Sequence, residues 1–536
     1  PGSRLPSGEA IWSMERPEGG AGMSGSVRRL VRLGVALALA LVAGGCGGGS
    51  SPSALVGVPV DTTLGTVPTT SAEAVAPTTP SADEAVEAST TTTGTPVEAS
   101  TTTTGPPVEA STTTVEVSVE ATTTTTTEEP PETTTTAAPI VLTDSFRGVT
   151  STTIRIGFTS IDFEKFNETY GFNLTYANYQ GAVDTYVTHI NATGGVLGRM
   201  VEVVHGTFLP VGATTAEAVC VEMAEDHQVF AVLNGFAGPG AEGVNECFGG
   251  LYDTILVGGK PTPEQLERVT ATWISDDISL GRRGRAFVNL LRETGRLADL
   301  GTFMLYGANG DYEPTIADTR AALEEAGVTV AVAVYNPNTG DEVATIAHME
   351  VLLERARVED VSTVFFIGEA AYAQEVLFDL GDEFVVLILN GDSTNRWKTD
   401  PPQGIDGAGT LLTNRSFLSS TDPVMADCLD VIEAGLGLEV RSVELLEEGE
   451  PNYWSATQTS CRLFELFRQI ATAAGPDLTN ESFAAAVDDL GSFSIPGQPY
   501  NSLGPGKYDA RDTLSLAEWD HEIGFWRAIS DPTDVG

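Results

Sequence analysis

The sequence predicts an α/β protein with two doubly wound lobes, each built on a parallel sheet that helices cover on both faces. From Ile154 onward, short apolar runs ending in Gly, Ser or Asn alternate with helical segments, as in βαβ units. Many of these runs are apolar at every position, which is typical of parallel strands buried between two helix layers. The part that can fold, residues 151–536, is roughly 390 residues long, and a core of that size normally divides into two.

The elements fall into two series and a C-terminal part. Each expected strand is a short apolar run bounded by turn residues, and each expected helix is a longer segment between two such runs. In the first series we expect strands at residues 154–159, 201–204, 229–233 and 255–257 and helices at 179–191 and 214–225. In the second we expect helices at 280–293, 313–326, 343–357 and 370–380 and strands at 302–306, 328–334, 361–367 and 385–389. Helices at 424–434, 456–474 and 481–490 and a β-like tail at 508–529 follow.

The charge balance restricts the partners. The chain has 28 basic and 74 acidic residues and a formal net charge of −46, which excludes nucleic acid as the main partner because nothing would neutralise its phosphates. Such an acidic surface indicates solubility, and a salt-adapted extracellular surface is the alternative interpretation.

The N-terminal region has the features of an export signal. After Met23 come three arginines, an apolar run at 33–43 and the sequence Ala43-Gly44-Gly45-Cys46. The run is too short for a bilayer-spanning helix, which needs roughly 20 residues. The last four residues resemble the bacterial lipobox, which implies a signal peptide at 23–45 and a lipid anchor on Cys46. An ordinary signal peptide followed by a stray cysteine is the alternative, and residues 1–22 are interpreted as upstream sequence with no role in the fold.

Residues 46–150 are expected to be a disordered tether. No Lys or Arg occurs between Ser51 and Ser145, and Thr, Ser, Pro, Val, Ala and Glu dominate. A repeat that starts at Val86 restarts at Val97 and Val108, but runs of Thr, Gly and Pro do not sustain a helix. Roughly 100 flexible residues span about 50 to 60 Å, enough to hold a domain away from a membrane.

Four cysteines remain in the part that can fold. In an exported protein Cys220, Cys247, Cys428 and Cys461 can pair in three ways. We expect the sequence-local pairs Cys220–Cys247 and Cys428–Cys461. Metal ligation is the rival, although the sequence has no CxxC motif and no His at ligand spacing.

Two segments resemble a known family. Residues 153–157, Thr-Ile-Arg-Ile-Gly, and the decapeptide from Ile190 to Arg199, Ile-Asn-Ala-Thr-Gly-Gly-Val-Leu-Gly-Arg, are similar to the opening of type I periplasmic-binding proteins of the leucine/isoleucine/valine-binding class. The placement of Cys220 and Cys247 resembles a disulfide of that family. The resemblance implies three crossovers between the lobes, near 275–281, 407–413 and 503–507. Lobe one would then comprise 151–276 and 412–502, and lobe two 277–411 and 503–536.

A ligand of such a fold is expected at the carboxyl ends of the strands, where the lobes face each other across a cleft. In the family, hydroxyls of lobe one hold a ligand carboxylate and an acid of lobe two holds the ammonium. Asp392 resembles that acid by position, and Tyr312 resembles the aromatic residue after the first strand of lobe two. Residues 258–260 replace the family's usual Ser-rich turn, where Lys260 offers a charge for an anion and Thr262 a hydroxyl. The candidate ligand residues are Thr159, Ser160, Phe236, Lys260, Thr262, Tyr312, Glu369, Tyr372 and Asp392.

These observations predict a binding protein and no enzyme. The sequence has no GxSxG, HExxH, EF-hand or Walker A motif, and we expect no cofactor. The predicted function is that of a monomeric, lipid-anchored extracytoplasmic protein that delivers a small polar ligand, amino-acid-like or related, to an ABC permease. A ligand sensor of the same fold is the first alternative, and an extracytoplasmic enzyme is the second.

Overall fold

The computed structural model describes residues 141–338, 340–368, 376–378, 381–389, 401–406, 422–442, 445–447, 449–522 and 524–536. The predicted signal peptide, Cys46 and nearly all of the tether lie outside these residues. In the part of the chain that the structure describes, no helix is both long and apolar enough to span a bilayer.

The first sheet has five parallel strands in the order β2-β1-β3-β4-β5. They are β1 (Thr153–Ile161), β2 (Met200–Phe208), β3 (Ala231–Asn234), β4 (Ile255–Gly258) and β5 (Trp273–Ile274). Ile154, Ile156 and Phe158 of β1 are buried against one layer of helices, and Val232 of β3 and Leu256 of β4 against the other. Strands covered on both faces are apolar throughout, which is the pattern in the sequence.

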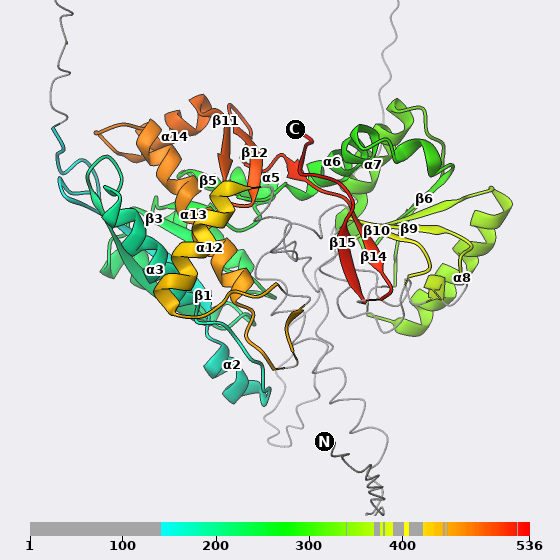
Figure 1. The fold of residues 1–536 in the computed structure, drawn as a ribbon, viewed down its shortest axis with the longest axis horizontal. Helices are drawn as coiled ribbons and strands as arrows, with labels where there is room; N and C mark the ends of the chain where they lie inside the picture. The colour runs from blue at the N-terminus through cyan, green and yellow to red at the C-terminus, as the bar shows by residue number, and fades with distance from the viewer. Residues whose placement is uncertain are drawn as a thin grey trace, which may run out of the picture. The chain divides into compact units, whose positions relative to one another are not determined.

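Segments far apart in the chain cover this sheet. Four of the described helices share its larger core: α3 (Tyr179–Ala192), α12 (Pro423–Leu436), α13 (Tyr453–Ala473) and α14 (Asn480–Asp489). Figure 1 shows α3, α12 and α13 side by side. The opposite face is covered by α4 (Thr214–Val221) and the short helices that follow it.

The second sheet has seven strands in the order β15-β14-β10-β9-β8-β6-β7. Five are parallel: β6 (Phe303–Gly307), β7 (Val330–Tyr335), β8 (Thr363–Ile367), β9 (Val385–Ile388) and β10 (Gly404–Asp406). The other two are β14 (Ala517–Asp520), which runs antiparallel to β10, and β15 (Phe525–Ala528), which runs antiparallel to β14. Helices α6 (Leu280–Glu293) and α7 (Glu313–Glu325) pack on one face, and α8 (Glu342–Val358) packs on the other.

The chain passes between the two sheets three times. It leaves the first sheet between β5 and α6, returns between β10 and α12, and leaves again between β12 (Gln498–Leu503) and β14. Strand β12 forms a hairpin with β11 (Gly491–Ile495), and β13 (Thr513–Leu514) pairs with β16 (Thr533–Asp534). The predicted α/β class with parallel sheets is confirmed.

Both predicted disulfides are confirmed. The Sγ atoms of Cys220 and Cys247 are 2.11 Å apart, and those of Cys428 and Cys461 are 1.90 Å apart. The first bond ties α4 to the turn before β4, and the second ties α12 to α13. Each bond therefore joins elements that pack on the first sheet.

Some elements differ from the sequence prediction. The helix predicted at 214–225 ends as an α-helix at Val221 and continues as a π-helical turn, Glu222–Asp226. Helix α2 (Phe163–Tyr170) follows β1 directly and was not predicted, because its aromatic residues have low helix propensity. Its caps stabilise it, since Asp162 accepts from the N–H of Lys165 and Gly171 takes the left-handed conformation. Of the helix predicted at 370–380, only residues 376–378 are described, and they are helical.

Candidate ligand-binding site

The carboxyl ends of β1, β3 and β4 lie along one edge of the first sheet. The register aligns Phe158 with Leu233 and aligns Asn234 with Gly258. The loops that follow these strands therefore begin side by side, at the edge where open α/β sheets bind ligands.

The chain turns sharply at the last residue of β3, Asn234. Asn234 has φ 81°, a left-handed conformation that is uncommon outside glycine, and its Nδ2 donates to the carbonyl of Thr159 at 2.8 Å. The hydroxyl of Thr159 donates in turn to the carbonyl of Gly235 at 2.5 Å, and Thr159 is fully buried. These bonds fix the two strand ends to each other, and they use the hydroxyl that the sequence assigned to the ligand.

The loop after β4 is fixed from two sides. Gly258 has φ 120°, and a Cβ at this position would lie 2.9 Å from the Cα of Asn234, so only glycine fits. The indole Nε1 of Trp273 donates to the carbonyl of Gly258 at 2.8 Å, and the hydroxyl of Ser275 donates to the carbonyl of Gly259 at 2.8 Å. The next residue, Lys260, is therefore held at the edge of the sheet by a rigid turn.

The structure places the other candidates of the first sheet in different surroundings. Ser160 is nearly buried, and its hydroxyl has no hydrogen-bond partner among the described residues. Phe236 is buried, stacked on Phe248 with ring centroids 5.3 Å apart. The hydroxyl of Thr262 accepts from the N–H of Gln265 in a capping box that begins α5 (Pro263–Leu266). Ser160 and Lys260 thus keep the side-chain groups best placed to meet a ligand.

Lys260 lies beside a carboxylate in the first crossover. Its Nζ is 3.4 Å from the Oδ2 of Asp277, and the same oxygen accepts a 2.5 Å bond from Arg283 of α6. The Oδ1 of Asp277 accepts from the N–H of Ile278 at 2.8 Å and from Arg511 at 3.3 Å. Asp277 therefore joins the loop after β4, the first crossover, α6 and the third crossover.

Further ion pairs extend this arrangement, which we call the crossover cluster. Arg462 of α13 donates to Asp276 at 2.5 Å, and Arg282 of α6 donates to Asp509 at 2.9 Å and pairs with Asp512 at 2.9 Å. The cluster comprises Lys260, Asp276, Asp277, Arg282, Arg283, Arg462, Lys507, Asp509, Arg511 and Asp512. The sequence prediction included Lys260 alone of this group.

Burial and neighbouring charges shift the pKa values of the cluster. Burial alone would raise the pKa of the Asp277 carboxyl, but Arg283, Lys260 and Arg511 together hold it well below its usual range. Burial lowers the pKa of Arg511 to about 10, and repulsion by Arg462 and Arg283 adds to this. Burial also lowers the pKa of Lys260, where Asp277 opposes the shift and Arg283 reinforces it. The cations of the cluster thus repel one another inside an acidic protein.

The candidates of the second sheet are described only in part. Tyr312 is buried at the start of α7, and a Cβ on Gly368 would lie 2.4 Å from its ring, so Gly368 is packed on the aromatic face. Glu369, Tyr372 and Asp392 lie outside the described residues.

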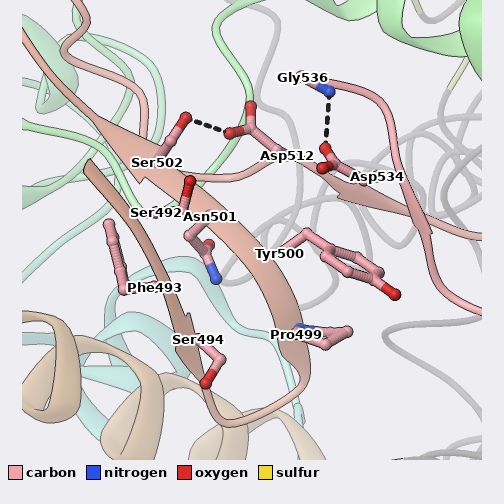
Figure 2. A pocket seen from close by; sticks show the side chains of 10 residues that line it. All are labelled: Ser492, Phe493, Ser494, Pro499, Tyr500, Asn501, Ser502, Asp512, Asp534 and Gly536. Carbon is pink, nitrogen blue, oxygen red and sulfur yellow. Dashed lines mark hydrogen bonds between the residues drawn. The ribbon is translucent and has the colours of Figure 1, made fainter.

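A separate pocket lies on the β11–β12 hairpin and the C-terminal segment. Figure 2 shows its lining, with Ser502 donating to Asp512 and the N–H of Gly536 donating to Asp534. Its volume is about 530 Å³, and none of the predicted ligand residues lines it. Within the described ranges, no group of three or more His, Cys, Asp or Glu side chains is arranged to hold a metal ion.

Comparison with known proteins identifies the fold. No protein-family model and no curated protein matches the chain. The crystal structure of an ABC transporter substrate-binding protein from Desulfitobacterium hafniense in complex with Leu is similar, with a TM-score of 0.51 and 14% sequence identity over 70% of this chain and 99% of that chain. A second structure of an ABC transporter substrate-binding protein from this organism gives the same values. The chain therefore has the type I periplasmic-binding fold, the fold of these substrate-binding proteins.

Proposed function

We propose that this protein is an extracytoplasmic solute-binding protein that captures a small polar ligand between two lobes and delivers it to an ABC permease. The observation that carries the proposal is the pair of sheets, each with five parallel strands, joined by three crossovers. In the first sheet, Thr159, Asn234 and Gly258 fix the edge at which the carboxyl ends of the strands lie, which we call the strand-end edge. The Leu complex of the similar Desulfitobacterium hafniense protein supports a ligand of amino-acid size.

The proposed contacts come from both sheets. Ser160 and Lys260 would bind a polar or anionic group, because the hydroxyl of Ser160 has no partner among the described residues and the side chain of Lys260 is partly exposed. Tyr312, Glu369, Tyr372 and Asp392 remain the proposed contacts of the second lobe, with Asp392 meeting a cationic or hydroxylated part of the ligand. Truncating one partner of a buried charged contact typically costs about 2 to 5 kcal/mol of affinity, so Asp392→Ala should weaken binding measurably.

The proposed location rests on the N-terminal sequence. A diacylglycerol on Cys46 would hold the protein on the outer face of a membrane, and residues 46–150 would act as the tether. The Cys46→Ala variant should appear in the soluble fraction while the wild type fractionates with membranes. A variant that stays with the membranes would refute the anchor.

The binding function is tested by differential scanning of the purified protein against amino acids and other small metabolites. A ligand at 100 times its Kd should stabilise the protein by about 2.7 kcal/mol, and calorimetry on wild type and Ser160→Ala should then show weaker binding by the variant. Uptake of the ligand should be measured in cells that lack the protein. Lost uptake would indicate transport, and unchanged uptake would indicate sensing. Chemical turnover of a bound compound by the purified protein would point to an enzyme instead.

A further inference from the structure

Asp277 has more cations around it than one carboxylate can neutralise. Arg283, Arg511 and Lys260 lie 2.5, 3.3 and 3.4 Å from its oxygens, and the N–H of Ile278 occupies a further acceptor position. A carboxylate offers about four acceptor positions, so Asp277 is saturated. Lys260 has the longest of these contacts and is the weakest partner of Asp277.

The neighbouring acid does not remove this excess. Asp276 accepts a 2.5 Å bond from Arg462, which brings a fourth cation to the pair of carboxylates. The Nη2 atom of Arg511 is buried and has no hydrogen-bond partner in the part of the chain that the structure describes. Among the described residues, the ion pairs of Asp276 and Asp277 therefore join four cations to two carboxylates.

Lys260 is the member of this group that a ligand can reach. Its side chain is 37% exposed, whereas those of Arg283 and Arg511 are 10% and 7% exposed. It also follows β4 directly, at the strand-end edge, on the turn that Trp273 and Ser275 hold in place. An anionic group arriving at this edge meets Lys260 before any buried cation of the cluster.

We propose that the ligand is an organic anion whose negative group replaces Asp277 as the partner of Lys260. This inference rests on the proposed function and narrows it, because the negative group of the ligand neutralises one of the surplus cations, whereas an ammonium next to that group would be repelled by the others. Of the two ligand parts proposed for Asp392, the inference therefore retains the hydroxylated one. The exchange also couples ligand binding to the first crossover. When Lys260 turns to the ligand, Asp277 loses this partner and keeps only its ion pairs with Arg283 of α6 and Arg511 of the third crossover.

The test uses compounds with one carbon skeleton and different charge. 4-Methylpentanoate is an anion, 4-methylpentanamide is its neutral counterpart, and leucine is the matched zwitterion; benzoate and benzamide form a second pair. We expect the acids to bind the wild type at least tenfold more tightly than the amides and the zwitterion. Lys260→Met should abolish this preference, and Lys165→Met, which removes the same charge from the exposed surface of α2, should preserve it.

A second variant tests the exchange itself. Asp277→Asn removes the competitor, so it should tighten binding of the acids severalfold, while Lys260→Met weakens it. Residues that only support the fold would not change affinity in opposite directions.

Three results would overturn the inference: equal binding of acids and amides, tighter binding of leucine than of 4-methylpentanoate, or an acid preference that survives in Lys260→Met. If only neutral, cationic or zwitterionic metabolites bind, the inference fails and the solute-binding function stands; if no compound binds at all, both fail.

Discussion

Arg462 on α13 donates a 2.5 Å hydrogen bond to Asp276 in the first crossover, and only about a tenth of either side chain is exposed. The carbonyl of Asp276 also accepts from the side-chain amide of Gln498 on β12 at 3.0 Å. A helix of the first lobe and the strand that leads to the third crossover are thus both bonded to one residue of the first crossover. The ion pair is placed to determine the geometry of the connection between the lobes.

Breaking this ion pair should be costly. Arg462→Met leaves a buried carboxylate without its cation, and the free energy of unfolding should fall by about 3 to 5 kcal/mol. Urea denaturation followed by circular dichroism measures the loss. Arg320→Met is the matched control, because Arg320 and Glu324 form a half-exposed pair on α7 that contributes less than about 1 kcal/mol. Equal losses in the two variants would show that the buried pair contributes no more than a surface pair.

The disulfide between Cys428 and Cys461 should stabilise the first lobe. It closes a loop of 33 residues in sequence separation between two helices that cover the sheet, and the chain-entropy model assigns such a loop about 4 kcal/mol. The double variant Cys428→Ala/Cys461→Ala should unfold at correspondingly lower urea concentration. Non-reducing peptide mapping of the wild type should recover this pair and the Cys220–Cys247 pair; crossed pairs would contradict the structure.

The sequence predicted the elements well where apolar runs and helical segments alternate clearly. Helix α6 has the predicted bounds of 280–293, and β9 starts at the predicted Val385. The same reasoning placed the loops at the strand-end edge but not the direction of their side chains. Phe236 illustrates the reason: the left-handed residues Asn234 and Gly235 reverse the chain, and the ring then packs between Phe208 and Phe248.

The crossover cluster could not be predicted from periodicity, because its partners are distant in sequence. Asp277 and Arg511 are 234 positions apart, and Asp276 and Arg462 are 186 apart. A signal was nevertheless present in the composition. In a chain with only 28 basic residues, Arg282, Arg283 and Arg285 lie within four consecutive positions, and Lys507 and Arg511 alternate with Asp509 and Asp512. In the structure, these two segments supply six members of the crossover cluster: Arg282, Arg283, Lys507, Asp509, Arg511 and Asp512.

Thr262 should act through stability alone. Its hydroxyl and the side chain of Gln265 form the capping box of α5, so Thr262→Ala should lower the free energy of unfolding by about 1 kcal/mol and leave the Kd for a bound solute unchanged. Thr262→Ser retains the hydroxyl and should retain the stability. Weaker binding by Thr262→Ala at unchanged stability would instead support the ligand contact predicted from the sequence.

Asp277 should make stability depend on acid pH. Its carboxyl has a pKa well below the usual range in the folded protein, because the attraction of Arg283, Lys260 and Arg511 outweighs the effect of burial. A depressed folded-state pKa gives a contribution that is complete above the unfolded-state value of about 4 and disappears as the pH falls through the folded-state value. The free energy of unfolding of the wild type should therefore exceed that of Asp277→Asn by about 3 to 5 kcal/mol at pH 7, and the difference should shrink steadily below pH ~4.

Urea titrations between pH 7 and pH 2 measure this difference in the free energy of unfolding. The control is Glu354→Gln, which removes an exposed partner of Arg357 and should change stability little at pH 7. A difference that stays constant down to pH 2 would mean that the asparagine disturbs packing and that the charge of Asp277 does not stabilise the crossover cluster.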